Sequence, residues 1–308
     1  MSAPQGWGKI GKELFRLELP KVAPSNNELR NMNRFAYQTL REMWRDMVAV
    51  ALGAQLPPKP TGISTEDWRE VVYTSLNDIR PVKPFETTAI KVLRHSVNEV
   101  DWDNAYGGLK PVLDCLVMPS KRNPDGLGFI KDDNPANMPL PPFVEQVKAK
   151  RGAGKTEIII FESSQSVERE PLFTGEPVYR FEIPLETPSN NVIKGMHFKD
   201  YRALRKRWQY EIIVAIGGRR PKVPLKVAGV AINRYSAGQL DWDNAYGGLK
   251  PLLDCLVNVS RRNPNGLGLI LDDNPTQMPV PPYLQQLRAR AEAGKTEVLI
   301  YGLEETAV

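Results

Sequence analysis

Two groups of acidic side chains are the residues of this sequence best suited to chemistry. Each group contains an Asp-x-Asp-Asn segment that is followed later by an Asp-Asp pair. The first group consists of Asp101, Asp103, Asn104, Asp132 and Asp133. The second group consists of Asp241, Asp243, Asn244, Asp272 and Asp273. Carboxylates gathered in one cleft repel one another by several kcal/mol at an effective dielectric constant of about 20, and a divalent cation removes that repulsion.

The donor atoms of these groups favour a hard cation. Neither group includes histidine or cysteine, so the ligands are oxygen atoms, which select Mg²⁺, with Mn²⁺ as the alternative, rather than zinc. A cation held by carboxylates can activate water and neutralise the charge that develops on a phosphodiester. Lys110 and Lys250 follow the two Asp-x-Asp segments and could offer a positive charge to the same phosphate. We therefore expect metal-dependent phosphodiester chemistry.

A purely structural interpretation of these aspartates stays open at this point. Aspartates in the first turn of a helix are stabilised by the helix dipole, and Asp-Asp-Asn-Pro is typical of a turn. A duplication copies structural residues as faithfully as functional ones. The Gly-Lys-Thr segments at 154–156 and 294–296 do not supply a phosphate-binding loop, because Ala149 and Ala289 stand where that loop requires glycine.

The positions of the two acidic groups follow from an internal repeat. The segment DWDNAYGGLKPVLDCLV at 101–117 recurs as DWDNAYGGLKPLLDCLV at 241–257, and the match continues to 161 and 301. This pattern indicates a tandem duplication. We predict a first domain at 15–162, a linker at 163–178 and a second domain at 179–304.

Each copy presents the same order of predicted elements. A strand ends at a Pro-Ser-Asn-Asn turn, and a helix with one apolar face follows. A second strand (88–95 and 227–235) leads into the Asp-x-Asp-Asn block. We expect this block to open a second helix that runs through LKPVLDCLV, with Pro111 and Pro251 near a kink or in an early helical turn. The last two segments of each copy, joined by a glycine-containing turn, predict a β-hairpin. The first copy also contains an insertion at about 55–80, where Ser64 and Asp67 indicate the start of an extra helix.

This order of elements predicts the α+β class. We expect two tandem domains, each a mixed β-sheet with flanking helices. With only two units, a solenoid is not expected, and two similar domains related by a pseudo-twofold axis are the natural arrangement.

The combination of motifs in both copies resembles the RusA family of Holliday-junction resolvases. The resemblance rests on the Pro-Ser-Asn-Asn turn, the DxDN segment, the following LK and LDxL, the G-[FL]-I-x-DD segment and the closing strands, and it covers nearly all of each copy. It implies that both domains are RusA-like. It also implies that the catalytic metal is held by the two aspartates of DxD and by the second aspartate of the later pair, with a lysine on the following helix assisting.

Carried onto this sequence, the resemblance gives a complete set of site residues. The implied metal ligands are Asp101, Asp103 and Asp133 in the first copy and Asp241, Asp243 and Asp273 in the second, and the implied catalytic lysines are Lys110 and Lys250. The residues expected to support these ligands are Asn104, Asp132, Asn244 and Asp272.

The function that the resemblance implies is Mg²⁺-dependent, structure-specific cleavage of DNA. Members of the family act as homodimers that nick two opposed strands of a four-way junction, so a fused pair would act as a pseudodimer within one chain. Two alternatives stay open: a non-cleaving DNA-binding protein of recombination, and a nuclease for flaps, forks or R-loops. Further dimerisation into a four-site assembly also stays open, and the habits of the family imply a phage or mobile-element origin.

Exposed basic residues would contact the phosphates of branched DNA. The best candidates lie in the paired loops that separate the ligand segments, and others lie on the first long helix of the second copy. These residues are Lys121, Arg122, Arg261, Arg262, Arg205 and Arg207. A solvated helix face is an equally good interpretation of the helical arginines.

Composition sets the remaining limits. The chain has 308 residues, 41% hydrophobic, with 41 basic and 36 acidic side chains and a net charge of +5, which permits a nucleic-acid partner without requiring one. The two cysteines, each in an LDCLV segment, fit neither a disulfide framework nor a metal site. Because we find neither a secretory signal nor a long apolar run, we expect a cytoplasmic protein with no membrane partner.

Overall fold

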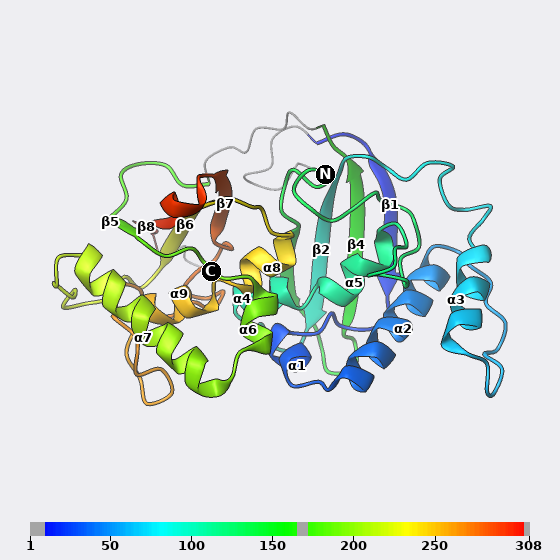
Figure 1. The fold of residues 1–308 in the computed structure, drawn as a ribbon, viewed down its shortest axis with the longest axis horizontal. Coiled ribbons are helices and arrows are strands. Elements are labelled where there is room, and N and C mark those ends of the chain that lie inside the picture. Colours follow the sequence, from blue (N-terminus) through cyan, green and yellow to red (C-terminus); the bar gives the residue numbers. More distant parts are fainter. Residues whose placement is uncertain (1–9, 165–171, 305–308) are drawn as a thin grey trace. The chain divides into compact units, whose positions relative to one another are not determined.

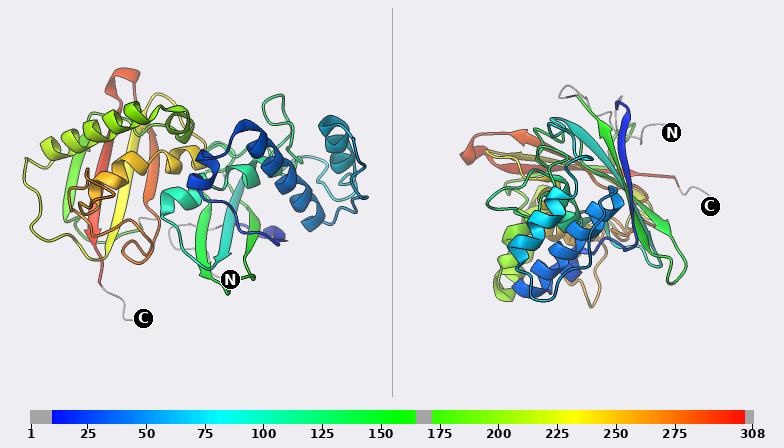
Figure 2. Two further views of the ribbon diagram at one scale, coloured as in Figure 1. Left: turned by 90° about the horizontal axis from the view of Figure 1, so that it is seen from below. Right: turned by 90° about the vertical axis from the view of Figure 1, so that its right-hand side faces the viewer.

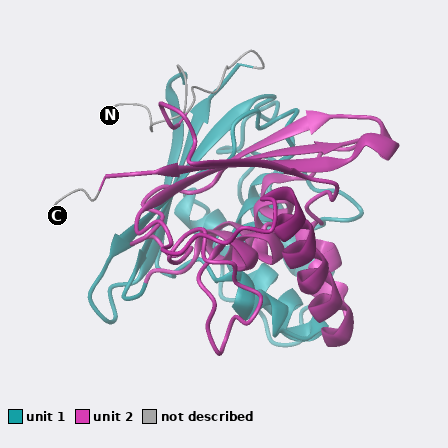
Figure 3. Cartoon of the chain, turned by 90° about the vertical axis from the view of Figure 1, so that its left-hand side faces the viewer, with its two compact units in different colours: residues 1–98, 108–170 teal, residues 99–107, 171–308 magenta. Residues whose placement is uncertain are grey.

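The computed structural model describes residues 10–164 and 172–304, which form two compact units. Unit 1 comprises residues 1–98 and 108–170, and unit 2 comprises residues 99–107 and 171–308 (Figure 3). Each unit is an α+β structure with a four-stranded mixed sheet. The α+β prediction is thus confirmed at the level of class. The segment 99–107 comes from the first copy of the repeat but belongs to unit 2.

Unit 1 contains the elements of the first copy apart from one helix (Figure 1). In chain order they are β1 (Glu13–Leu19), α1 (Asn26–Arg30), α2 (Arg34–Ala51), α3 (Thr65–Thr74), β2 (Thr88–Ser96), α5 (Lys110–Leu116), β3 (Phe143–Lys148) and β4 (Lys155–Glu162). The long helix α2 buries Trp44 and Val48, which are fully inaccessible, and packs against β1 and α5. Its apolar face therefore closes the core on one side of the sheet.

Unit 2 repeats this architecture and adds the helix from the first copy. Its elements are α4 (Trp102–Gly107), β5 (Tyr179–Ile183), α6 (Asn190–Gly195), α7 (Phe198–Ala215), β6 (Ala228–Ser236), α8 (Trp242–Gly247), α9 (Lys250–Leu256), β7 (Tyr283–Arg288), the 3₁₀ turn η1 (Ala291–Ala293) and β8 (Lys295–Gly302). Helix α7 packs on α9 and β5 with Trp208 and Ile212 buried, and Figure 2 shows α7 and α9 over one face of the sheet.

The sheet order corrects the predicted hairpin. In unit 1 the order is β1-β4-β2-β3, and in unit 2 it is β5-β8-β6-β7. Strand β2 pairs parallel to β3 and antiparallel to β4, so it lies between the two segments that we expected to pair with each other. The short turn between β3 and β4 suggested direct pairing. However, six of the nine residues of β2 are buried, against one of the six of β3, so β2 takes the interior position and β3 lies at the edge of the sheet.

The helix expected to follow the Asp-x-Asp-Asn block is broken into two. In unit 2, α8 ends at Gly247 and α9 starts at Lys250. Pro251 lies in the first turn of α9, where its missing N–H costs nothing, but the same proline could not continue an earlier helix. Gly248 lies at the break, and a Cβ atom there would collide with the carbonyl oxygen of Pro188 in the Pro-Ser-Asn-Asn turn.

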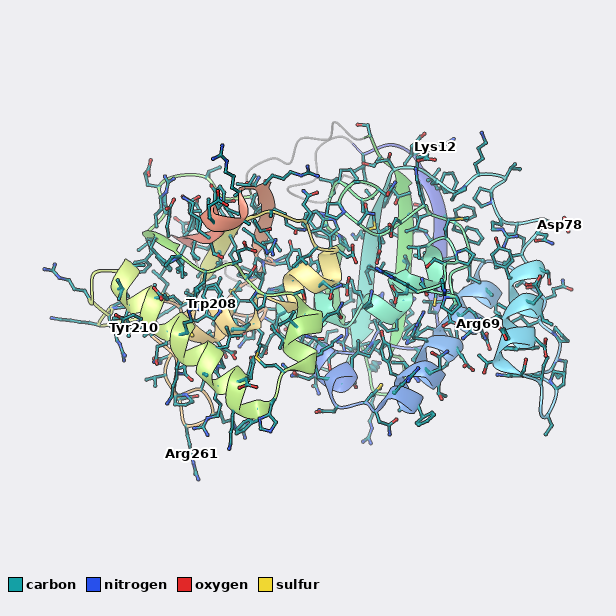
Figure 4. The ribbon with its side chains drawn as sticks, viewed as in Figure 1. Lys12, Arg69, Asp78, Trp208, Tyr210 and Arg261 are labelled. Carbon is teal, nitrogen blue, oxygen red and sulfur yellow. The ribbon has the colours of Figure 1, made fainter. Side chains whose placement is uncertain are left out.

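The predicted extra helix of the first copy is present as α3 and is capped as expected. The Ser64 hydroxyl accepts a hydrogen bond from the backbone N–H of Asp67 at 3.0 Å. Helix α3 carries Arg69, which is labelled in Figure 4. The guanidinium of Arg69 lies 2.8 Å from the fully buried carboxylate of Asp125 and ties α3 to the rest of unit 1. Arg45 on α2 donates to the same carboxylate at 3.0 Å.

The second copy has no equivalent of α3, and a neutral hydrogen bond replaces the buried ion pairs of Asp125 there. Asn265 stands at the position of Asp125 and donates a hydrogen bond at 3.0 Å to Gln209, which stands at the position of Arg45.

Of the predicted linker 163–178, residues 165–171 lie outside the described part of the chain, and 172–178 contain neither helix nor strand. Within the described residues, none of the helices combines the length and the apolar character that crossing a membrane requires.

Candidate metal centre

Helix α4 brings the first Asp-x-Asp-Asn block into unit 2. The indole Nε1 of Trp102 donates to the backbone oxygen of Met278 at 2.7 Å. The ring of Tyr106 stacks on that of Tyr246 with centroids 3.9 Å apart and planes inclined by 11°. These contacts hold α4 against α8 and the loop before β7. The aspartates at the start of α4 are therefore positioned by residues of the second copy.

Three carboxylates meet at this point. One oxygen from each of Asp101, Asp103 and Asp273 lies within 4.8 Å of the others, and Asp103 and Asp273 are buried. The resemblance groups Asp101 and Asp103 with Asp133, whereas here Asp273 of the second copy lies beside them. The physical reason is that the chain enters unit 2 at residue 99 and leaves it after 107, so that the aspartates are docked among second-copy residues.

The turn before β7 presents Asp273. The side chain of Asp272 accepts hydrogen bonds from the backbone N–H of Asp273 at 2.9 Å and from the side chain of Asn274 at 2.8 Å. Both oxygens of Asp272 are thus used to shape the turn, and Asp273 is left to point into the cluster. Asp132 makes the same two bonds around Asp133 in unit 1.

Lys250, the first residue of α9, is the cation of this cluster. Its Nζ lies 3.8 Å from Oδ1 of Asp103 and 3.0 Å from Oδ1 of Asp254, one helical turn later. Sequence reasoning missed Asp254, although the spacing of four positions from Lys250 is a usable signal for such a pair. Arg205 on α7 in turn lies 3.5 Å from the other carboxylate oxygen of Asp254. In unit 1, Lys110 pairs with Asp114 at 3.0 Å in the same way.

Burial dominates the electrostatics of the cluster. Desolvation raises the pKa of Asp101 and Asp273 above the usual range and raises that of Asp103 to about 6, while Lys250 acts in the opposite direction on each. Desolvation also lowers the pKa of Lys250, but three carboxylates together outweigh it, so the pKa lies well above its usual value and the amine stays protonated. These carboxylates are those of Asp103, Asp254 and Asp273. One lysine thus faces more buried negative charge than it can balance.

The residues of the cluster fit a divalent cation. Both carboxylate oxygens of Asp103 and Oδ2 of Asp273 are buried and accept no hydrogen bond from any group in the described ranges 10–164 and 172–304. Buried acceptors without donors are costly, and a cation satisfies several of them at once. The donor set consists of oxygen atoms alone, which suits Mg²⁺ or Mn²⁺.

The remaining predicted residues lie as follows. Asp241 and Asp243 are in unit 2 at the start of α8, where Asn244 donates to Asp243 at 3.4 Å. The pKa of Asp101 is raised by burial, and the side chain of Asn104 opposes this rise in part.

The predicted basic residues fall into two groups. Five of them are exposed, and Figure 4 shows one, Arg261, on the loop after α9. The exposed residues are Lys121, Arg122, Arg207, Arg261 and Arg262. The sixth, Arg205, is only 15% exposed and is held by Asp254 and by the side-chain oxygen of Asn263. Arg205 therefore supports the partner of Lys250.

Comparison with known proteins adds little to this geometry. No protein-family model matches the chain, and no curated protein matches it. A solved structure of cyanuric acid hydrolase from A. caulinodans is similar at 11% sequence identity with a TM-score of 0.18. The match covers 70% of this chain, and the chain spans 58% of that protein's length. A likeness at this level carries no argument about fold or function.

Proposed function

We propose that this protein is a Mg²⁺-dependent endonuclease that resolves four-way DNA junctions by paired nicking. The observation that carries the proposal is the cluster of Asp101, Asp103 and Asp273 with Lys250 beside it. These are residues that the resemblance to RusA-family resolvases singles out, although they come from both copies. Mn²⁺ is the alternative ion.

In this proposal the three carboxylates hold the metal, and Asp103 and Asp273 do so with oxygens that accept no hydrogen bond within residues 10–164 and 172–304. The bound ion supplies charge neutralisation at the scissile phosphate and a more acidic water. Lys250 stays protonated and adds a positive charge at the same place. Asp254 fixes the amine of Lys250, and Arg205 fixes Asp254, so both are positioning residues.

Paired nicking requires a second set of reacting groups, and the repeat supplies the residue types. The counterparts of the cluster are Asp241, Asp243, Asp133 and Lys110. One chain would then act as a pseudodimer on a substrate of matching symmetry. The exposed pairs Lys121–Arg122 and Arg261–Arg262 stand at equivalent positions and would contact the phosphates of two DNA arms.

The experiment that tests the proposal is cleavage of a synthetic four-way junction, with linear duplex as the control substrate. We expect two nicks with Mg²⁺, none with a chelator, and none on the duplex. Asp101→Asn combined with Asp103→Asn should abolish one nick, and Asp241→Asn combined with Asp243→Asn should abolish the other. Junction binding without a Mg²⁺-dependent product would instead indicate a non-cleaving DNA-binding protein, and faster cleavage of flaps, forks or R-loops would replace the proposed substrate.

A further inference from the structure

A cavity in unit 1 lies away from the acidic cluster in sequence and has the opposite charge. It has a volume of about 210 Å³ and is bounded by the loop after β1, by α1 and α2, and by β2. Its polar lining consists of Lys21, Glu28 and Arg94, and the rest is mainly apolar. The volume is several times the roughly 30 Å³ that a water molecule occupies in the liquid.

Arg94 is a buried cation at the wall of this cavity. It is 7% exposed, and its Nε and Nη1 donate to the backbone oxygens of Ala23 at 3.1 Å and Asn98 at 3.3 Å and to the hydroxyl of Ser96 at 2.6 Å. Across residues 10–164 and 172–304, Nη2 donates no hydrogen bond and no carboxylate forms an ion pair with Arg94. One edge of the guanidinium is therefore available at the wall of the cavity.

The second copy contains the same arginine with its charge balanced. Arg234 donates to the backbone oxygens of Thr187 at 3.1 Å and Gly238 at 3.0 Å, which repeats the arrangement around Arg94. Its Nη2 also donates to Oε2 of Glu186 at 3.2 Å. Val22 stands at the position of Glu186 in the first copy. The acid that neutralises the arginine in one copy is thus replaced by an apolar side chain in the other.

A second difference at the same place adds positive charge. Lys21 in the first copy corresponds to Leu185 in the second, and it forms no ion pair within the described ranges. Glu28 also lines the cavity, but its carboxylate accepts a hydrogen bond from the backbone N–H of Ser25 at 2.6 Å in the capping box of α1. Burial lowers the pKa of Arg94, and the charge of Glu28 only partly opposes this. The cavity therefore carries a desolvated positive charge that an anion would stabilise.

We propose that this cavity binds a phosphate group, held by the free edge of the Arg94 guanidinium and by Lys21. A guanidinium matches the geometry of phosphate oxygens, and such charge-assisted hydrogen bonds are about twice as strong as neutral ones. The phosphate could be free in solution or could be part of a DNA backbone. The site does not depend on the proposed nuclease activity.

The first experiment titrates the full-length chain with inorganic phosphate in a calorimeter at constant ionic strength. Val22→Glu should weaken binding at least tenfold, because it supplies the carboxylate that Arg234 already has. The variant should fold, since Val22 and Glu186 both lie against an equivalent glycine, Gly154 and Gly294. The matched control, Leu185→Lys with Glu186→Val, should add a second phosphate ion. Unchanged binding of both phosphate and DNA in Val22→Glu, or a wild-type chain that binds neither, overturns the proposal.

The second experiment distinguishes the two sources of phosphate. The affinity of a four-way junction is measured over a series of salt concentrations for the wild type and for Val22→Glu. A DNA phosphate in the cavity predicts weaker binding of the variant and a salt-dependence slope smaller by about one. A free phosphate predicts unchanged DNA affinity together with the lost phosphate binding of the first experiment. If Val22→Glu leaves both phosphate and DNA binding unchanged, no phosphate site exists here.

Discussion

At the scale of single residues, the buried carboxylates of the acidic cluster lower the stability of the folded protein unless a cation is bound. Asp103 is 1% exposed, and among the described residues its buried oxygens accept no hydrogen bond and its nearby cation, Lys250, is shared with Asp254. Burial raises the pKa of the carboxyl because the charged form is poorly solvated. Such a residue costs stability in the metal-free protein and is explained by binding rather than by folding.

We expect the metal-free protein to lose stability as the pH rises through the pKa of Asp103. Folding raises this pKa from 3.8 to about 6. Between these values the folded state binds more protons than the unfolded state, so the free energy of unfolding falls as the pH rises. The shift corresponds to at most about 3 kcal/mol. Denaturant unfolding with a chelator present, at pH values on both sides of this window, measures the effect.

Asp103→Asn provides the control for this pH dependence. The variant has no carboxyl to titrate, so without metal it should be more stable than the wild type at neutral pH and should vary less with pH. Added Mg²⁺ should stabilise the variant less than the wild type, because the variant has lost one ligand of the cluster. Identical pH profiles for the two proteins would refute this explanation of the raised pKa.

The sequence named each aspartate of the cluster but could not group them. The two copies are identical over DWDNAYGGLK, so local chemistry gives no reason for Asp101 and Asp103 to join Asp273 rather than Asp133. Asp254 was overlooked because the LDCLV segment was interpreted as buried helix, which it also is.

At the scale of elements, two features decide how the cluster is built: the break between α4 and α5, and the docking of α4 on unit 2. If α4 and α5 formed one continuous helix, the residues after Gly107 would extend the axis of α4 instead of returning to unit 1. The Gly-Gly pair and Pro111 allow the chain to stop one helix and start another. The predicted hairpin was wrong for a related reason, since turn residues reveal that the chain reverses but not which strand it pairs with.

We expect Trp102→Phe to weaken the metal site through α4. The change removes the 2.7 Å hydrogen bond to the carbonyl of Met278, at a cost of about 1 kcal/mol, and loosens the helix that carries the aspartates. Mn²⁺ affinity, measured by electron paramagnetic resonance, should fall by roughly tenfold. Trp68→Phe is the control, since it removes a similar bond to Asp46 in unit 1 and should leave Mn²⁺ affinity unchanged. An equal loss of Mn²⁺ affinity in both variants would mean that the packing of α4 does not determine Mn²⁺ affinity.

The insertion helix α3 gives a prediction about stability alone. Asp125 is fully buried among arginines, so Asp125→Ala leaves unpaired buried charge and should lower the free energy of unfolding by about 3–5 kcal/mol. Asn265→Ala removes only a neutral hydrogen bond and should cost about 1 kcal/mol. Chemical denaturation of both variants compares them. Similar losses at the two positions would show that the ionic network around α3 contributes no more than its neutral counterpart.

At the scale of the whole molecule, the repeat and the structural units do not coincide. The sequence predicts two continuous domains, whereas residues 99–107 belong to unit 2 while the chain on either side of them belongs to unit 1. An acidic cluster assembled from both copies would lose ligands if the copies existed separately. Fusion into one chain keeps the two copies at a fixed ratio and a high effective concentration.

The most direct test of this account is the number of Mn²⁺ ions bound by the wild type and by aspartate variants, with the fold checked by circular dichroism. We predict that Asp103→Asn, Asp273→Asn and the variant that combines these two changes each lose the same single ion, because both residues hold it. Asp133→Asn combined with Asp103→Asn is the comparison, because Asp133 is outside this cluster. If Asp273→Asn kept the ion that Asp103→Asn loses, or if the combined Asp103→Asn and Asp273→Asn variant lost more ions than either single variant, the composite metal centre would be contradicted.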